Sequence, residues 1–72
     1  MTEGKRIGRR IKELRKQSGL TQEQVANELQ MSPYYLRQIE HGKANPRVNL
    51  VGRIISYLET VIADRAKEEA VK

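Results

Sequence analysis

The stretch TQEQVANELQMSPYYLRQIEHG, residues 21–42, carries the signals that decide the fold. Thr21 and Gln24 fit a capping box, in which each side chain accepts a hydrogen bond from the other residue's backbone N–H at the start of a helix. Further on, Ser32 is a favoured N-cap, and Pro33 suits the first helical position, where no backbone N–H is needed. The stretch therefore predicts two short helices in immediate succession.

Apolar residues at helical spacing extend this pattern beyond the stretch. Ile7, Ile11 and Leu14 recur at i, i+4 and i+7, and residues at this spacing share one face of a helix. Gly19 and Gly42 follow two of the predicted helices, at the place where a left-handed residue commonly ends a helix. The expected helices cover residues 5–17, 21–30, 32–41 and 48–59.

Two short helices joined by about three residues form a helix-turn-helix. Because no strand pattern or internal repeat interrupts the helical periodicity, we expect an all-α fold, a compact four- to five-helix bundle that contains this motif. Residues 1–59 are expected to form the domain and residues 60–72 a C-terminal helical extension or tail. Good helix formers follow Thr60, so this last segment either continues the fourth helix or frays.

The composition limits the classes of function. The chain has 72 residues and a formal net charge of +5, and seven of its 14 basic side chains lie in residues 1–20. So short a chain holds one domain, and the positive charge favours an anionic partner. The absence of cysteine excludes disulfides and a thiolate zinc site, and no apolar run is long enough to span a membrane. We expect a cytoplasmic protein.

Catalytic and ligand-binding signals are missing from the pattern. The lone His41 lies between Glu40 and Gly42, and the chain has no second His and no Cys with which to build a catalytic or metal cluster. We therefore expect no enzyme activity, no metal, no cofactor and no small-molecule ligand. A membrane-surface role is not expected either, because the apolar stripe of the first helix is narrow and is needed for the core.

The segment from Ile7 to Leu58 resembles the lambda-repressor/Cro-type helix-turn-helix family, also called XRE-like. The positions that match are Ile11, Leu14-Arg15, Gly19-Leu20-Thr21-Gln22, Val25-Ala26, Leu29, Ser32, Leu36, Ile39-Glu40, Gly42, Asn45-Pro46, Leu50, Ile54 and Leu58. The resemblance implies a sequence-specific DNA-binding transcriptional regulator of prokaryotic or phage type, a repressor. One departure is Gln30, which stands where the family usually has a Gly, in a turn that favours a positive φ.

The third helix is then the expected recognition helix, lying in the major groove of double-stranded DNA. At about 100° per residue, Leu36 faces inward, whereas Tyr34, Arg37 and Gln38 lie on the outer side. We expect Arg37 to bind guanine, Gln38 to pair with adenine, and Tyr34 to contact a thymine methyl group or a phosphate. The alternative is that these three are solvated surface residues.

The resemblance also implies contacts to the phosphate backbone and one internal ion pair. The expected phosphate ligands are Gln22, Lys43, Asn45, Arg47 and Arg10. Arg6 and Arg9, like Arg10, are candidates for contacts from the first helix to the backbone or a neighbouring groove. Gln22 occupies the family's phosphate-binding position at the start of the second helix, where free backbone N–H groups converge. Arg15 and Glu40 correspond to a pair that joins the first helix to the end of the recognition helix, and their expected role is orientation. In so charged a chain, some of these cations are expected to contact only water.

A homodimer is expected, because one short helix reads only a few base pairs and two copies can bind a pseudo-palindrome. The fourth helix carries more apolar surface than a single small core needs. The expected interface residues are Val51, Ile55, Tyr57, Leu58 and Ile62. The alternative is that these side chains only cover the first two helices.

Two other functions fit the same motif. An antitoxin would repress its own operon and bind a toxin, with residues 60–72 as the docking segment. A protein-interaction module would use the fold without reading DNA, and it predicts acidic or apolar residues on the outer face of the third helix. Arg37 and Gln38 favour DNA, and DNA binding predicts that affinity falls with salt at a log–log slope of about −0.9 per neutralised phosphate.

Overall fold

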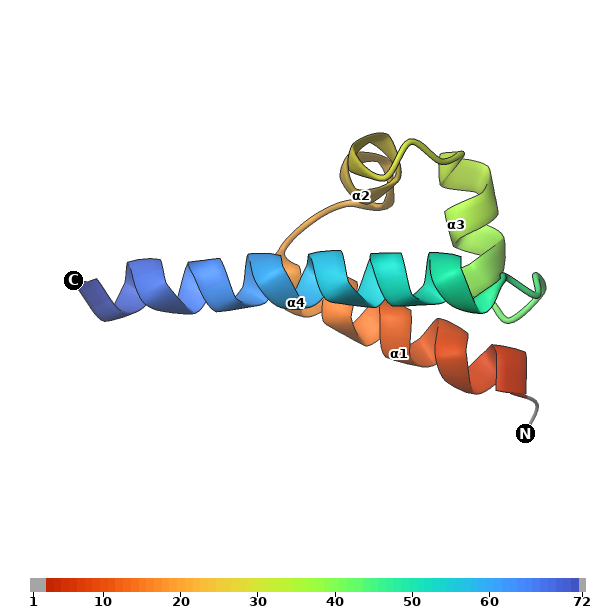
Figure 1. Cartoon of the computed structure of the whole chain (residues 1–72), viewed down its shortest axis with the longest axis horizontal. Helices are drawn as coiled ribbons and strands as arrows, with labels where there is room; N and C mark the ends of the chain where they lie inside the picture. The colour runs from red at the N-terminus through yellow and green to blue at the C-terminus, as the bar shows by residue number, and fades with distance from the viewer. Residues whose placement is uncertain (1–2, 72) are drawn as a thin grey trace.

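Four α-helices and their short connections make up the described part of the chain (Figure 1). This computed structural model describes the backbone of residues 3–71 and the side chains of residues 3–68. The helices are α1 (Glu3–Ser18), α2 (Gln22–Glu28), α3 (Pro33–Glu40) and α4 (Val48–Val71). In Figure 1, α1 and α4 lie side by side, and α2 and α3 pack together on one side of α4. The predicted all-α fold class is confirmed.

The predicted capping signals start the two short helices of the motif. The Gln24 backbone N–H donates to Thr21 Oγ1 at 3.1 Å, and the Thr21 backbone N–H donates to Gln24 Oε1 at 2.9 Å. The capping box is therefore complete. At the start of α3, Ser32 Oγ accepts from the Tyr35 backbone N–H at 3.3 Å, and Pro33 is the first helical residue. These bonds satisfy N–H groups that have no partner inside the helix.

The turn between α2 and α3 keeps its left-handed residue although that residue is not glycine. Gln30 has a φ of 56°. Its N–H donates to the Asn27 carbonyl at 3.2 Å, and the Met31 N–H donates to the Ala26 carbonyl at 2.9 Å. This pair of bonds is a Schellman motif, which satisfies the last carbonyls of α2. The departure from the family pattern at Gln30 therefore leaves the turn geometry intact.

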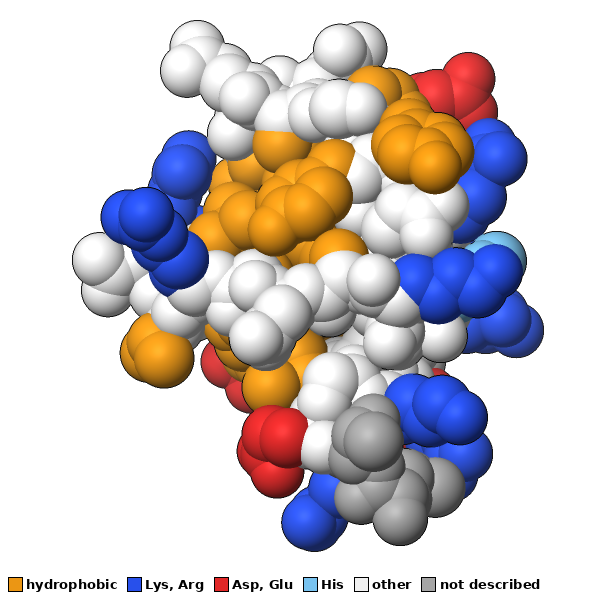
Figure 2. Space-filling model, turned by 90° about the vertical axis from the view of Figure 1, so that its right-hand side faces the viewer, with side chains coloured by type: hydrophobic (Ala, Val, Ile, Leu, Met, Phe, Trp, Pro, Cys, Tyr) orange, Lys and Arg blue, Asp and Glu red, His pale blue; other side chains and the backbone are white. Residues whose placement is uncertain are grey.

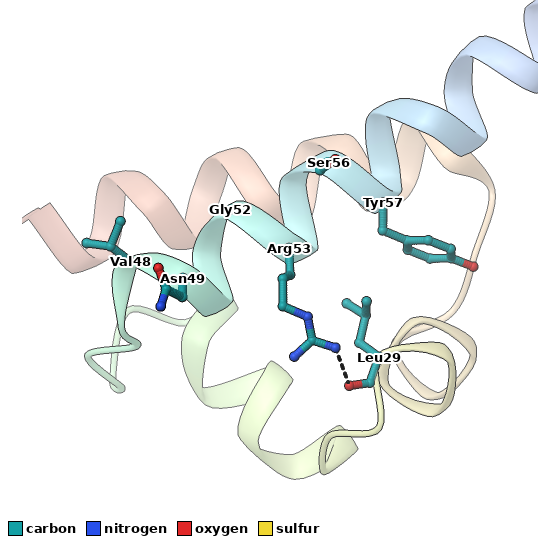
Figure 3. A pocket seen from close by; sticks show the side chains of 7 residues that line it. All are labelled: Leu29, Val48, Asn49, Gly52, Arg53, Ser56 and Tyr57. Carbon is teal, nitrogen blue, oxygen red and sulfur yellow. Dashed lines mark hydrogen bonds between the residues drawn. The ribbon is translucent and has the colours of Figure 1, made fainter.

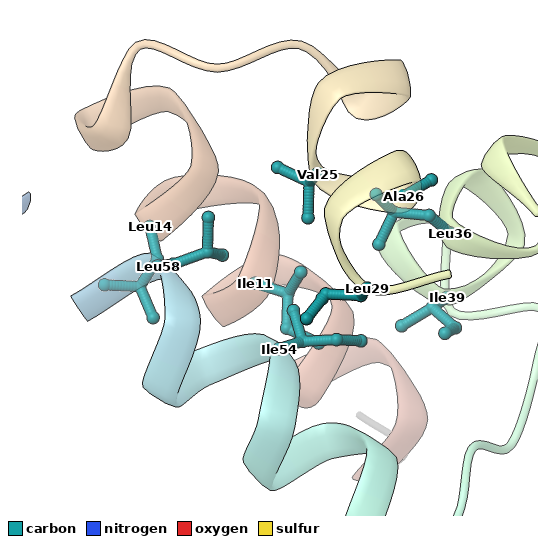
Figure 4. Close-up of a cluster of buried hydrophobic side chains, with 9 residues drawn as sticks. All are labelled: Ile11, Leu14, Val25, Ala26, Leu29, Leu36, Ile39, Ile54 and Leu58. Atoms are coloured by element: carbon teal, nitrogen blue, oxygen red, sulfur yellow. The ribbon is translucent and has the colours of Figure 1, made fainter. Parts of the chain in front are cut away.

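The core lies where the four helices meet (Figure 4). Its buried apolar side chains are Ile11, Leu14, Val25, Ala26, Leu29, Leu36, Ile39, Ile54 and Leu58. Each large aliphatic side chain buried in this way contributes roughly 1.5–3 kcal/mol to the free energy of folding. The predicted inward positions of Leu36 and Ile39 hold, since they are 0% and 1% exposed. The core thus fixes which side of α3 remains outside.

Gly8 allows α1 to approach the end of α3 closely. A Cβ atom at this buried position would collide with the Ile39 carbonyl oxygen and would lie 2.9 Å from the Glu40 carbonyl oxygen. Ordinary contacts between such atoms are about 3.5–4 Å. Only a residue without a side chain therefore fits where α1 crosses the last turn of α3.

Of the two outcomes left open for the segment after Thr60, the structure shows continuation, because α4 runs unbroken to Val71. Thr60 does not interrupt it, since its hydroxyl donates to the Ser56 carbonyl at 2.9 Å within the helix. Beyond it, Arg65 Nη1 donates to the Gln17 carbonyl at 3.1 Å and so caps the C-terminus of α1. None of the helices described is both long and apolar enough to cross a membrane.

Candidate nucleic-acid interface

The outer face of α3 presents three of the residues expected to read bases. Tyr34 is 65% exposed, Arg37 is exposed and Gln38 is half-buried. The opposite face of the helix carries Leu36 and Ile39, which anchor it in the core. An exposed aromatic ring, a guanidinium and an amide therefore project from one rigid surface, and these groups can match donors, acceptors and methyl groups on base edges.

The loop between α3 and α4 holds three of the expected phosphate ligands. Lys43, Asn45 and Arg47 are all exposed. The loop begins with Gly42 at a φ of 74°, and the Lys43 N–H donates to the Gln38 carbonyl at 2.9 Å. These two features tie the start of the loop to α3. The two loop cations and the amide are thus carried at the end of the same helix as the base-reading candidates.

Arg15 and Glu40 form a bidentate pair between α1 and α3. Arg15 Nε lies 2.7 Å from Glu40 Oε2, and Arg15 Nη2 donates to Glu40 Oε1 at 3.0 Å. The Glu40 side chain is only 1% exposed, so its charge depends on this partner. Arg15 Nη1 also donates to the Leu20 carbonyl at 3.1 Å. One guanidinium therefore connects the end of α3 to the segment that leads into α2.

Gln22 also contacts this pair, and the sequence did not predict that contact. Its Nε2 donates to Glu40 Oε1 at 3.1 Å, so the Glu40 carboxylate links α1, α2 and α3. The amide nitrogen of Gln22 keeps a second N–H, because each side-chain amide has two donors. Gln22 is also the first residue of α2, where backbone N–H groups are unpaired within the helix. The contact with Glu40 therefore holds Gln22 in place and leaves donors for a phosphate.

A second arginine supports the motif from α4. Arg53 Nη2 donates to the Leu29 carbonyl at 3.3 Å, and Leu29 is the C-cap of α2 (Figure 3). Arg53, Gly52 and Tyr57 belong to a shallow, open hollow along α4 that Leu29 closes on the α2 side. The sequence offered no signal for the Arg53 contact, because it joins residues 24 positions apart through a backbone carbonyl.

Basic side chains of α1 lie beside the end of α3. Lys5, Arg9 and Lys12 line a hollow together with Glu40 and His41. Figure 2 shows Lys and Arg side chains along the right-hand edge of the molecule, with the histidine among them. Arg10, an expected phosphate ligand, does not line this hollow. It is exposed on another side of α1, about 160° around the helix from Lys12.

The five residues expected at a dimer interface do not all lie on one exposed surface of the structure. Leu58 is 0% exposed within the core, so it has no surface to offer a second copy, and its assignment to the interface is corrected. Tyr57 lies about 160° around α4 from Ile55, on the side of Leu29 and α2. Val51, Ile55 and Ile62 are half-buried and share one side of α4. Only these three remain together on one surface.

The fold and this surface define a helix-turn-helix protein, and comparison with known proteins agrees. A family model described as a helix-turn-helix domain matches residues 6–67, so the chain belongs to that family. The resemblance to the lambda-repressor/Cro type is thereby confirmed. No solved structure matches the chain.

Two proteins of Bacillus phage phi105 are similar in sequence. The chain is 41% identical over 54 residues to the "ImmF control region 10 kDa protein", an alignment that covers 75% of this chain and 60% of that protein. It is 32% identical over 65 residues to the "Immunity repressor protein", covering 90% of this chain and 45% of that protein. The chain therefore spans less than two thirds of the length of either relative.

Proposed function

We propose that this protein is a sequence-specific DNA-binding transcriptional regulator that acts as a repressor and has no enzymatic activity. The observation that carries the proposal is the outer face of α3, where Tyr34, Arg37 and Gln38 project from a helix-turn-helix whose inner face is locked in the core. The membership of the helix-turn-helix family and the similarity to a phage immunity repressor support a DNA-binding regulator.

The proposed mechanism places α3 in the major groove. Arg37 forks onto the O6 and N7 acceptors of a guanine, and Gln38 pairs with the N6 and N7 groups of an adenine. Gln38 is half-buried, so few rotamers remain to it, and its amide loses little entropy when it binds. Tyr34, which is 65% exposed, contacts a thymine methyl group or a phosphate near the start of the helix.

Phosphate contacts position this helix. Lys43, Asn45 and Arg47 bind the backbone from the loop, and Gln22 binds it from the N-terminus of α2. The second N–H of the Gln22 amide and the unpaired backbone N–H groups of α2 are donors of the kind that phosphate oxygens accept. These contacts contribute affinity and orientation and carry little information about sequence.

Two copies of the chain are proposed to bind together. A single α3 reads few base pairs, and a two-fold pair reads two half-sites one helical turn apart, roughly 34 Å. Val51, Ile55 and Ile62 are the proposed contact, because they are apolar, partly exposed and on one side of α4.

Selection of bound duplexes from random DNA tests the proposal. We expect a short pseudo-palindromic motif to be enriched. Substitution Arg37→Ala is expected to relax the preference at one position of each half-site, by about 1–3 kcal/mol of discrimination. Lys43→Ala is the matched control, and it is expected to weaken all sequences alike. Recovery of no common motif, or chemical-shift changes that avoid α3 when duplex is added, would refute the proposed function.

A further inference from the structure

A row of cations on α1 flanks the recognition helix and is not explained by the core. Lys5, Arg9 and Lys12 form one wall of a hollow of about 260 Å³ whose other side is Glu40 and His41. Residues four and seven apart lie on one side of a helix, so these three cations fall within about 60° of one another around α1. The hollow therefore has a strongly positive wall.

The acidic residue of the hollow does not offset this charge. Both carboxylate oxygens of Glu40 are bound by Arg15, and the Glu40 side chain is 1% exposed. Its charge is already balanced inside the protein. Arg9 and Lys12 thus line a hollow whose acidic residue, Glu40, is already paired with Arg15.

The hollow is continuous with the outer face of α3. His41 is the C-cap of α3 and is exposed, and by helical angle it lies on the same side as Tyr34 and Arg37. The close approach at Gly8 holds α1 against this end of α3. A duplex lying along α3 would therefore pass beside the α1 wall.

We propose that this hollow is a second phosphate-binding site, in which Arg9 and Lys12 bind a backbone phosphate of the duplex that α3 reads. The inference rests on the proposed function. The Arg9 guanidinium offers paired donors to two phosphate oxygens, Lys12 adds a compact charge, and His41 also lines the hollow. The interface thus extends beyond the helix-turn-helix onto α1, where the sequence had suggested Arg6, Arg9 and Arg10 as contacts to the backbone or a neighbouring groove.

A purely structural role for Arg9 and Lys12 makes a different prediction. Cations near the C-terminus of a helix stabilise its dipole by about 0.3–1 kcal/mol, and the last turn of α3 is close by. If Arg9 and Lys12 served only that purpose, their loss would lower the free energy of unfolding and leave the dependence of DNA affinity on salt unchanged.

The salt dependence of affinity for the selected duplex tests the site. Variants Arg9→Gln and Lys12→Gln each remove one positive charge. Lys67→Gln is the matched control, because it removes the same charge from an exposed position on α4. We expect the log–log slope to become shallower in each test variant, by at most about 0.9 for the one phosphate that Arg9 and Lys12 share, and to change little in the control. Urea unfolding of all three variants is measured in parallel.

The possible results distinguish a failure of the second phosphate site from a failure of the proposed DNA-binding function. Normal slopes in Arg9→Gln and Lys12→Gln overturn the second site and leave the reading role of α3 standing. Equal shallowing in all three variants also overturns it, because that result indicates only the long-range field of the net charge. A wild-type protein that binds no duplex with a salt-dependent affinity overturns the proposed function itself.

Duplexes with one uncharged methylphosphonate linkage locate the phosphate. At the contacted position the neutral linkage is expected to weaken DNA binding by the wild-type protein, and Arg9→Gln is expected to remove that sensitivity while Lys67→Gln keeps it. If the DNA affinity of Arg9→Gln stays as sensitive to the neutral linkage as that of the wild type at every position, the proposed second phosphate site is wrong.

Discussion

Gln30 occupies a left-handed conformation that costs a non-glycine residue about 1 kcal/mol, and the structure retains it at a φ of 56°. We expect Gln30→Gly to raise the free energy of unfolding by up to about 1 kcal/mol, because glycine adopts this φ without strain. Urea denaturation followed by circular dichroism measures the change. Asn27→Gly, at an exposed position inside α2, is the control and is expected to lower stability by about 0.3 kcal/mol. A loss of stability in both variants would contradict the strain at residue 30.

The stability of the protein is expected to be sensitive to substitution of Arg15, because Arg15 is the ionic partner of the buried Glu40 carboxylate. Arg15→Met is expected to lower the free energy of unfolding by about 3–5 kcal/mol, since it leaves a 1% exposed charge without its partner. The double variant Arg15→Met/Glu40→Leu removes that charge and is expected to recover part of the loss. Urea unfolding of both variants decides the point. A double variant less stable than Arg15→Met would show that the charge itself is not the cause.

At the scale of residues, the sequence predicted the polar pair but not all of its partners. The alignment of Arg15 and Glu40 with a known family pattern was sufficient to expect their contact, and the structure places them at 2.7 Å. The Gln22 side chain was expected to face phosphate alone, whereas it also donates to Glu40. No local pattern signals a hydrogen bond between the start of one helix and the end of another, because it depends on how the helices pack.

At the scale of helices, two glycines should respond in opposite ways to the same substitution. Gly8→Ala is expected to destabilise the protein although alanine is the better helix former, because the new methyl group would collide with the Ile39 carbonyl. Gly52→Ala is expected to stabilise α4 by about 1 kcal/mol, since nothing lies within 4 Å of the added atom. Thermal unfolding compares the two variants. Stabilisation by both would mean that α1 does not approach α3 as closely as described.

The helix boundaries show which signals are local. Thr21, Ser32 and Gly42 predicted starts and an end correctly, because a cap acts through backbone groups within a few residues. The end of α4 was left open by the sequence, and the helix continues to Val71. Its last turns contact the C-terminus of α1 through Arg65, a contact that spans 48 residues and that helical periodicity does not record.

At the scale of the whole molecule, the proposed dimer depends on the partly exposed apolar side of α4. Val51→Glu is expected to shift the proposed dimer to monomer, because a carboxylate in an apolar contact loses its hydration without gaining a partner. Sedimentation velocity measures the shift. Ser56→Glu is the control, since Ser56 is exposed about 140° around the helix from Val51. If the wild-type protein stays monomeric at high concentration, the proposed dimer is wrong. If dimers survive Val51→Glu, the contact between the two copies lies elsewhere.

Because Gly8 has no side chain beyond a hydrogen atom, it also sets the distance between α1 and α3. This distance determines how near the cations of α1 come to α3, and hence which backbone phosphate they can reach in the proposed complex with DNA. In a homologue with a larger residue there, α1 must stand off from α3 by the thickness of that side chain. We infer that such a homologue would protect a wider stretch of DNA from cleavage around each half-site than this protein does.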